Sequence, residues 1–168
     1  GNGLSFAAHA RILGASEIVM IGSASRRSMA QRVGVTSYID YRSESILDEI
    51  RSAGVQKVDI ILDAVGKTGA VDNVLGLLRP GGTVAIYGID DYGKLTVDVA
   101  GSGSTFTVWN GGYDEAETHG EVCEYYLAGE LPSEIWYDNA STFELDKIAL
   151  AFDSIGKRQS VKALINLG

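Results

Sequence analysis

The residues from Ile21 to Arg27 place glycine, hydroxyl and guanidinium groups directly after a short apolar run. In order they read Ile-Gly-Ser-Ala-Ser-Arg-Arg, so two serines and two arginines follow one glycine, and no carboxylate stands among them. Hydroxyl and guanidinium groups donate hydrogen bonds to phosphate oxygens, and each charge-assisted bond contributes about 1.5–3 kcal/mol. The segment therefore predicts a site for a phosphate group.

The place of this segment in the chain indicates which phosphate it binds. In a dinucleotide-binding βαβ unit, an Asp or Glu at the end of the second strand accepts hydrogen bonds from the adenosine ribose and repels a 2′-phosphate. This chain has Gly22 at that position, so both the negative charge and the volume of the acidic side chain are absent. The donors offered in its place are Ser23, Ser25, Arg26 and Arg27. One or two such bonds give a tenfold or greater preference, so the pattern predicts NADP(H) rather than NAD(H). The alternative is that both arginines are solvated residues of a helix's first turn.

Alternating apolar runs and helical segments position these groups. Short apolar runs bounded by turn residues predict strands over 17–21, 37–41, 58–63 and 83–88. Helices are predicted between them over 4–13, 27–33, 45–52 and 68–78, and the last ends at a turn made by residues 79–82. This alternation predicts an α/β fold with a doubly wound parallel sheet. The later chain predicts strands over 105–109, 141–143 and 161–167 and helices over 114–128 and 145–155.

Composition limits the function classes. The chain has 168 residues and a formal net charge of −8, which disfavours nonspecific binding to nucleic acid or anionic membranes. It has one cysteine, which excludes an intrachain disulfide and a cysteine-rich zinc site within these residues. No apolar run is long enough to span a membrane and no signal sequence is visible, so we expect a cytoplasmic protein.

Several short segments, in their order and spacing, resemble the C-terminal half of the medium-chain, zinc-type alcohol dehydrogenase/reductase family. The resemblance spans nearly the whole chain. It rests on Gly1-Asn2-Gly3-Leu4, Ile12-Leu13-Gly14-Ala15, Val35 to Tyr41, Asp59 to Gly66, Leu78 to Gly82, Tyr87-Gly88, Phe143 to Leu145, Ala151-Phe152 and Val161 to Ala163.

The resemblance implies an incomplete nucleotide-binding unit. Counting back from Gly14 puts Gly3 on the third glycine of the family's fingerprint, so the first two glycines and the first, central strand are expected upstream. It implies an N-terminally truncated Rossmann domain over 1–136 and a segment over 137–168 that in the family returns to the catalytic domain. The family's zinc ligands belong to that catalytic domain, so we expect no catalytic and no metal-binding residue here.

The resemblance also assigns cofactor contacts. Gly1, Asn2, Gly3 and Leu4 offer backbone N–H groups at a helix N-terminus to the pyrophosphate. Tyr41 aligns near the adenine pocket. The carboxyl ends of two strands line the adenosine and nicotinamide ends of the cofactor, through Ala64, Val65, Gly66 and through Tyr87, Gly88, Ile89 respectively. In this family, NADP-specific members often carry an arginine where this chain has Ala24, which leaves open whether Arg26 or Arg27 makes the phosphate contact.

Three functions are compatible with these observations. The first is the NADP(H)-binding domain of a zinc-dependent alcohol or polyol dehydrogenase, acting on a small alcohol or carbonyl substrate. The second is a zinc-independent quinone or enoyl reductase of the same family, and the third is a non-catalytic nucleotide-binding or structural module. The strand Thr105 to Trp109 is predicted to form an edge through which a homodimer or homotetramer assembles.

The remaining polar and aromatic residues have structural interpretations. His9, His119 and Cys123 lack further ligands at metal-binding spacing, and the His119–Cys123 pair is interpreted as a coincidence of helical spacing. Asp63 is predicted to order the loop that follows its strand rather than to act as a base.

Overall fold

A computed structural model describes residues 1–91, 96–98, 100, 103, 105–112, 114–137 and 141–168. The chain forms two compact units. Unit 1 comprises Gly1–Tyr38 and Asp114–Gly168, and unit 2 comprises Ile39–Tyr113. Unit 1 therefore joins the two ends of the chain, whereas unit 2 is one continuous segment.

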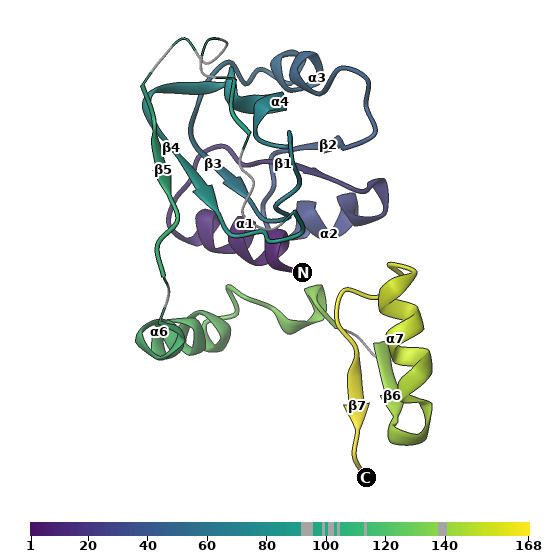
Figure 1. Ribbon diagram of the computed structural model, residues 1–168. Helices are drawn as coiled ribbons and strands as arrows, with labels where there is room; N and C mark the ends of the chain where they lie inside the picture. Colours follow the sequence, from purple (N-terminus) through teal and green to yellow (C-terminus); the bar gives the residue numbers. More distant parts are fainter. Residues whose placement is uncertain (92–95, 99, 101–102, 104, 113, 138–140) are drawn as a thin grey trace. The chain divides into compact units, whose positions relative to one another are not determined.

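Unit 2 contains a three-stranded parallel sheet (Figure 1). Its strands are β3 (Val58–Asp63), β4 (Leu78–Ile86) and β5 (Thr107–Trp109), in the order β3-β4-β5. Among the described residues of this unit, the helix α3 (Ile46–Ser52) and the single turn α4 (Asp72–Leu75) accompany them. Buried Val71, Leu75, Leu78 and Val84 form the core, so the sheet is held by apolar residues from α4 and β4.

Two predicted boundaries in unit 2 are wrong. The helix predicted over 68–78 is only α4, and the turn predicted over 79–82 lies inside β4. The pairing with β3 shifts there, from Val58 opposite Leu78 to Ile60 opposite Thr83. Gly81 has a φ of +78° and donates its N–H to Thr105 O at 2.8 Å. The strand therefore continues through an irregularity at Pro-Gly-Gly instead of ending there.

The first half of unit 1 surrounds the segment that predicts phosphate binding. It contains α1 (Asn2–Ile12), β1 (Val19–Gly22), the 3-10 turn η1 (Ala24–Arg26) and α2 (Arg27–Arg32), and β2 (Ser37–Asp40) pairs with β1. Small residues let α1 pack closely, since Ala7 and Ala8 are buried with Leu4, Ala30 and Tyr38 in the core. The predicted strands and helices of this region are thus confirmed, with ends shifted by one or two residues.

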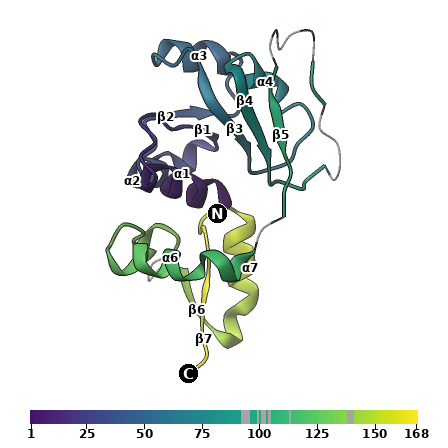
Figure 2. The same ribbon diagram turned by 90° about the vertical axis from the view of Figure 1, so that its left-hand side faces the viewer.

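The second half of unit 1 contains α6 (Glu115–Leu127), the turns η2 (Ser133–Ile135) and η4 (Leu145–Lys147), and a strand–helix–strand ending. In that ending, β6 (Thr142–Glu144) pairs in parallel with β7 (Leu164–Asn166), and α7 (Ile148–Gly156) lies beside both strands in Figures 1 and 2. Ile135 joins the buried core of α1 and α2.

The sequence predicts core contacts for helix α6 through Val122, Tyr125, Tyr126 and Leu127, and the structure does not bury them. Val122, Tyr126 and Leu127 are exposed, and the helix has no buried residue. Asp114 caps it by accepting the Ala116 N–H at 2.9 Å. The helix is rich in Glu, so its apolar residues form no continuous stripe that a core could cover.

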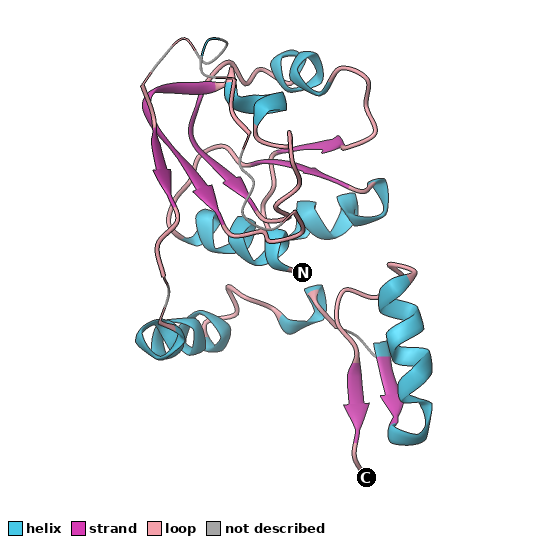
Figure 3. Ribbon diagram, in the orientation of Figure 1, coloured by secondary structure: helices cyan, strands magenta, loops and turns pink. Residues whose placement is uncertain are grey.

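The described strands form three separate sheets, and their strands are shown in magenta in Figure 3. The sheets pair β1 with β2, β3 with β4 and β5, and β6 with β7. None of these described sheets pairs β1 or β2 with β3. No helix among the described residues combines the length and the apolar character needed to cross a membrane.

Candidate cofactor-binding site

The end of β1 has no space for a side chain at position 22. A Cβ atom built on Gly22 would overlap the Tyr38 hydroxyl and lie 3.2 Å from Tyr38 Cζ. That hydroxyl donates a hydrogen bond to Ser23 O at 2.7 Å, so it holds the loop as well as filling the space. A side chain at position 22 would thus collide with Tyr38, a contact that sequence reasoning missed because Tyr38 looks like an ordinary strand residue.

The loop after β1 carries the hydroxyl and guanidinium groups from which phosphate binding is predicted. Ser23 Oγ and Ser25 Oγ lie 3.1 Å apart in a hydrogen bond. The Arg27 guanidinium carbon lies 5.2 Å from the centre of the Tyr38 ring, in a cation–π contact. Guanidinium N–H groups remain able to donate in the plane of the group while its face rests on the ring.

Arg26 is held by the C-terminal segment rather than lying free in solvent. Its Nη2 donates to Ser160 O at 2.9 Å, and its Nη1 lies 3.6 Å from Met29 Sδ. Partial burial, and then the charge of Arg158, lower the pKa of Arg26, although Tyr38 acts in the opposite direction. The interpretation of Arg26 as a solvated helix residue therefore does not hold.

The N-terminus of α1 lies beside a second cation. A Cβ built on Gly1 would lie 4.0 Å from Lys162 Cε. The first turn of α1 has no acidic residue and no side-chain cap, so the N–H groups of Asn2 and Gly3 stay available to an anion. Nothing in the sequence around Lys162 signals this position, which follows from the fold alone.

In unit 2 the loops that follow β3 and β4 are tied to each other. The Gly88 N–H donates to Asp63 O at 2.9 Å, and the Asp90 N–H donates to Val65 O at 3.0 Å. Asp63 Oδ1 accepts the N–H groups of Val65 and Gly66 at 2.9 and 2.8 Å. The predicted role of Asp63 in ordering its loop is therefore confirmed.

These tied loops carry most of the contacts predicted for unit 2. Gly66 has a φ of +85°. A Cβ built on either Gly66 or Gly88 would overlap the other loop's backbone, so both positions need glycine. Val65 and Ile89 are exposed beside them. Tyr41 is exposed elsewhere in unit 2, where the Arg42 guanidinium carbon lies 5.3 Å from its ring centre.

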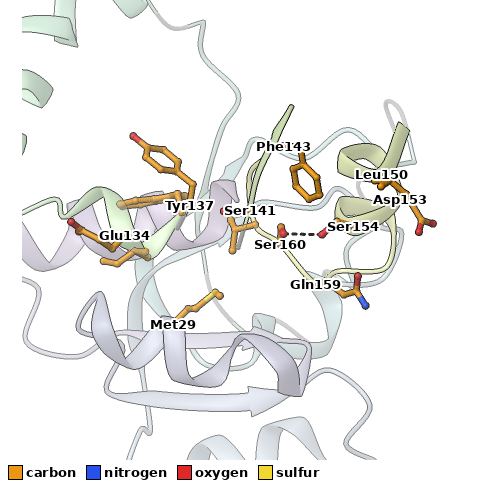
Figure 4. A pocket seen from close by; sticks show the side chains of 13 residues that line it. Met29, Glu134, Tyr137, Ser141, Phe143, Leu150, Asp153, Ser154, Gln159 and Ser160 are labelled. Carbon is orange, nitrogen blue, oxygen red and sulfur yellow. Dashed lines mark hydrogen bonds between the residues drawn. The ribbon is translucent and has the colours of Figure 1, made fainter. Parts of the chain in front are cut away.

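A cavity of about 400 Å³ lies within unit 1, next to the residues that hold Arg26 (Figure 4). Arg26 contacts Met29 and Ser160, and both of these residues line the cavity. Across the cavity wall, the hydroxyls of Ser154 and Ser160 are 2.8 Å apart. Trp136 also lines the cavity, and its buried Nε1 has no hydrogen-bond partner among the described residues.

The described residues contain no group of three or more His, Cys, Asp or Glu side chains placed to hold a metal ion. His119 Nε2 and Cys123 Sγ lie 3.6 Å apart on α6, one helical turn from each other. His9 packs edge-on against Tyr125, with ring centres 5.9 Å apart. The residues described here therefore do not fit a zinc ion.

Comparison with known proteins gives related sequences and folds. Residues 1–110 match the family model described as zinc-binding dehydrogenase. The chain is 28% identical to a 2-haloacrylate reductase from Burkholderia sp over 94% of its own length and 50% of that protein's. Benzyl alcohol dehydrogenase from Acinetobacter calcoaceticus shares the fold with a TM-score of 0.83 at 22% identity, covering 99% of this chain and 47% of that one.

A quinone oxidoreductase from Escherichia coli, whose structure was solved with NADPH, shares the fold with a TM-score of 0.77 at 19% identity. The match covers 99% of this chain and 54% of that one. This chain thus spans about half the length of each of these three proteins.

Proposed function

Because the chain belongs to the zinc-binding dehydrogenase family, we propose that it binds NADP(H) for hydride transfer to or from a small alcohol or carbonyl compound. The resemblance to medium-chain alcohol dehydrogenases and reductases is confirmed by this membership, and so is the parallel α/β fold. Cofactor choice, substrate and turnover are our proposals for the whole protein.

The phosphate groups of the cofactor bind unit 1 in this proposal. The pyrophosphate takes the N–H groups at the start of α1, from Gly1 to Leu4, with Lys162 beside them. The 2′-phosphate takes the loop after β1. Its donors there are Ser23, Ser25, Arg26 and Arg27. The single observation that carries the proposal is the Tyr38 hydroxyl in the space of a Gly22 side chain, because it removes the group that selects NAD(H).

The loops of unit 2 bind the two ends of the cofactor in this proposal. Residues 64–66 contact the adenosine side, residues 87–89 contact the nicotinamide side, and Tyr41 packs near the adenine. Asp63 supports both loops through its side-chain and backbone oxygens, so the loops hold their shape before the cofactor arrives. Nicotinamide supplies hydride transfer at its C4 when bound. The part played by this chain is to bind and orient it.

A zinc-independent reductase is the second candidate. The 2-haloacrylate reductase that matches 94% of this chain supports a reductase. Metal analysis of the whole protein distinguishes the two candidates. Bound stoichiometric zinc that is needed for turnover supports the alcohol dehydrogenase, and full turnover after chelation supports the reductase.

We also propose that β5 mediates self-association into a dimer or tetramer. It lies at the end of the strand order in unit 2, and Val108 and Trp109 are each about half exposed there. An exposed apolar edge strand offers unpaired backbone groups to a second copy. Light scattering of the wild type and of Val108→Lys tests this: a monomer in both at micromolar concentration contradicts it.

Titration of the 168-residue chain with NADPH and with NADH, followed by nicotinamide fluorescence, tests the proposed cofactor. We expect at least tenfold tighter binding of NADPH, because one or two charge-assisted bonds to the 2′-phosphate distinguish the two cofactors. Equal affinities, or tighter binding of NADH, contradict the proposal.

A further inference from the structure

The loop that follows α7, residues 157–162, carries three cations and contacts the loop after β1. They are Lys157, Arg158 and Lys162. Ser160 O accepts the hydrogen bond of Arg26 at 2.9 Å, which fixes this loop against the loop after β1. Lys157 is neutralised locally, because its Nζ lies 2.6 Å from Asp153 Oδ2.

Arg158 has an unfavourable backbone conformation. Its φ is +59°, and it is the single non-glycine residue with positive φ in the part of the chain that the structure describes. Its N–H donates to Ile155 O at 2.9 Å in the turn that ends α7, a position where glycine is the usual residue. A non-glycine residue in this conformation costs stability, and such strain concentrates at functional positions.

The charge of Arg158 also lacks a partner. Its exposed side chain has no ion pair or hydrogen bond within the described ranges. After burial, its charge is the second cause that lowers the pKa of Arg26. Arg26 likewise has no anionic partner there. Two neighbouring guanidinium groups repel each other until an anion is placed between them, and a phosphate dianion turns that repulsion into attraction.

We propose that Arg158 is a ligand of the cofactor's 2′-phosphate, acting with Arg26, so that the C-terminal segment helps to select NADP(H). This inference rests on the proposed function, and it adds a contact that the loop after β1 does not provide. Arg26 is the link between the two loops. One of its nitrogens is fixed on Ser160 O, and its remaining N–H groups stay available to the phosphate.

Calorimetric titration with two adenosine fragments tests the inference. The probe 2′,5′-ADP carries the 2′-phosphate, whereas 5′-AMP lacks it. In Arg158→Ala we expect about a tenfold weaker affinity for 2′,5′-ADP and less than a twofold change for 5′-AMP. Arg158→Gly is expected to give the same loss, and because glycine suits the backbone there, a loss in this variant is not due to misfolding.

Lys157→Ala is the matched control, since it removes the same charge from the same loop while its side chain is already paired with Asp153. It is expected to bind both probes as the wild type does. The inference is wrong if Arg158→Ala binds 2′,5′-ADP with the affinity of the wild type, or if its affinity falls equally for both probes. The proposed function stands in either case. If the wild type shows no preference for 2′,5′-ADP over 5′-AMP, the proposed cofactor itself is wrong.

Discussion

Replacing Gly88 by alanine separates the two loops that we assign to the cofactor's ends. The added Cβ would overlap the backbone of Val65 and Gly66, and backbone atoms cannot move aside as a flexible side chain does. Such overpacking costs about 1–3 kcal/mol. The lower entropy of the unfolded alanine chain returns about 0.4–1 kcal/mol. We therefore expect a net loss of about 1–2 kcal/mol in the stability of unit 2.

Gly66→Ala is expected to cost more than Gly88→Ala. It meets the same steric overlap with the facing loop, and its φ of +85° adds the cost of left-handed backbone, about 1–2 kcal/mol. The control is Gly76→Ala, which makes the same change in the same unit where nothing lies within 4 Å and φ is −61°. This variant is expected to be unchanged or slightly more stable.

Urea unfolding with Trp109 as the probe measures these differences within unit 2. Trp109 lies in β5 and the other tryptophan, Trp136, lies in unit 1, so a Trp136→Phe background leaves a signal from unit 2 alone. With an m-value of about 2 kcal/mol/M, Gly88→Ala is expected to lower the midpoint by about 0.5–1 M. Equal midpoints for Gly88→Ala and Gly76→Ala would refute the close approach of the two loops.

Four further outcomes are expected. Gly22→Asp is expected to weaken NADPH binding at least tenfold and to destabilise the chain. Adding Tyr38→Phe to this variant is expected to restore stability but not NADPH affinity. Titration with NADPH and thermal unfolding of both variants measure the two effects. Lys162→Ala weakens NADPH and NADH alike by about threefold to tenfold, because the pyrophosphate is common to both, and unequal losses count against that placement. Asp63→Ala lowers the free energy of unfolding by about 1–2 kcal/mol and Asp63→Asn by less, since the amide oxygen can still accept both N–H groups. The preference for NADPH falls between pH 7.5 and pH 5, because a phosphate monoester takes up a proton near pH 6 and loses half its charge, and a ratio of dissociation constants that is constant with pH contradicts this.

Local patterns predicted the elements of this chain better than their ends. The apolar run from Val58 to Asp63 gives β3 with the same bounds, because a short apolar run of β-branched residues bounded by turns is a local signal of a strand, although Ile60 and Leu62 are exposed in the structure. Pro80 and the glycines after it predict a turn, but β5 lies beside them and Thr105 O accepts the Gly81 N–H, so tertiary pairing keeps the segment within β4. Such pairing depends on residues about 25 positions away and cannot be seen in a local window.

Some residues of the candidate site could be predicted from the sequence, and others could not. The glycine, serines and arginines of residues 22–27 stand together in the sequence, so their chemistry was visible there. Tyr38, Arg158 and Lys162 reach the same part of unit 1 only through folding, and their residue types are ordinary for a strand and a surface loop. Aromatic hydroxyls and cations acquire a specific role from their neighbours, which the sequence alone does not provide.

The two ends of the chain depend on each other at this site. Arg26 and Ser160 are 134 positions apart, yet one hydrogen bond joins them within unit 1. A cofactor phosphate that binds Arg26 therefore also acts on the loop that carries Arg158 and Lys162, and any change in that loop alters the position of Arg26. Because binding free energies are reciprocal, ordering of the C-terminal segment strengthens cofactor binding by the same factor by which the cofactor orders that segment. In the function that we propose, selection of the cofactor is therefore a property of the folded unit rather than of the Gly-Ser-Ala-Ser-Arg-Arg segment alone.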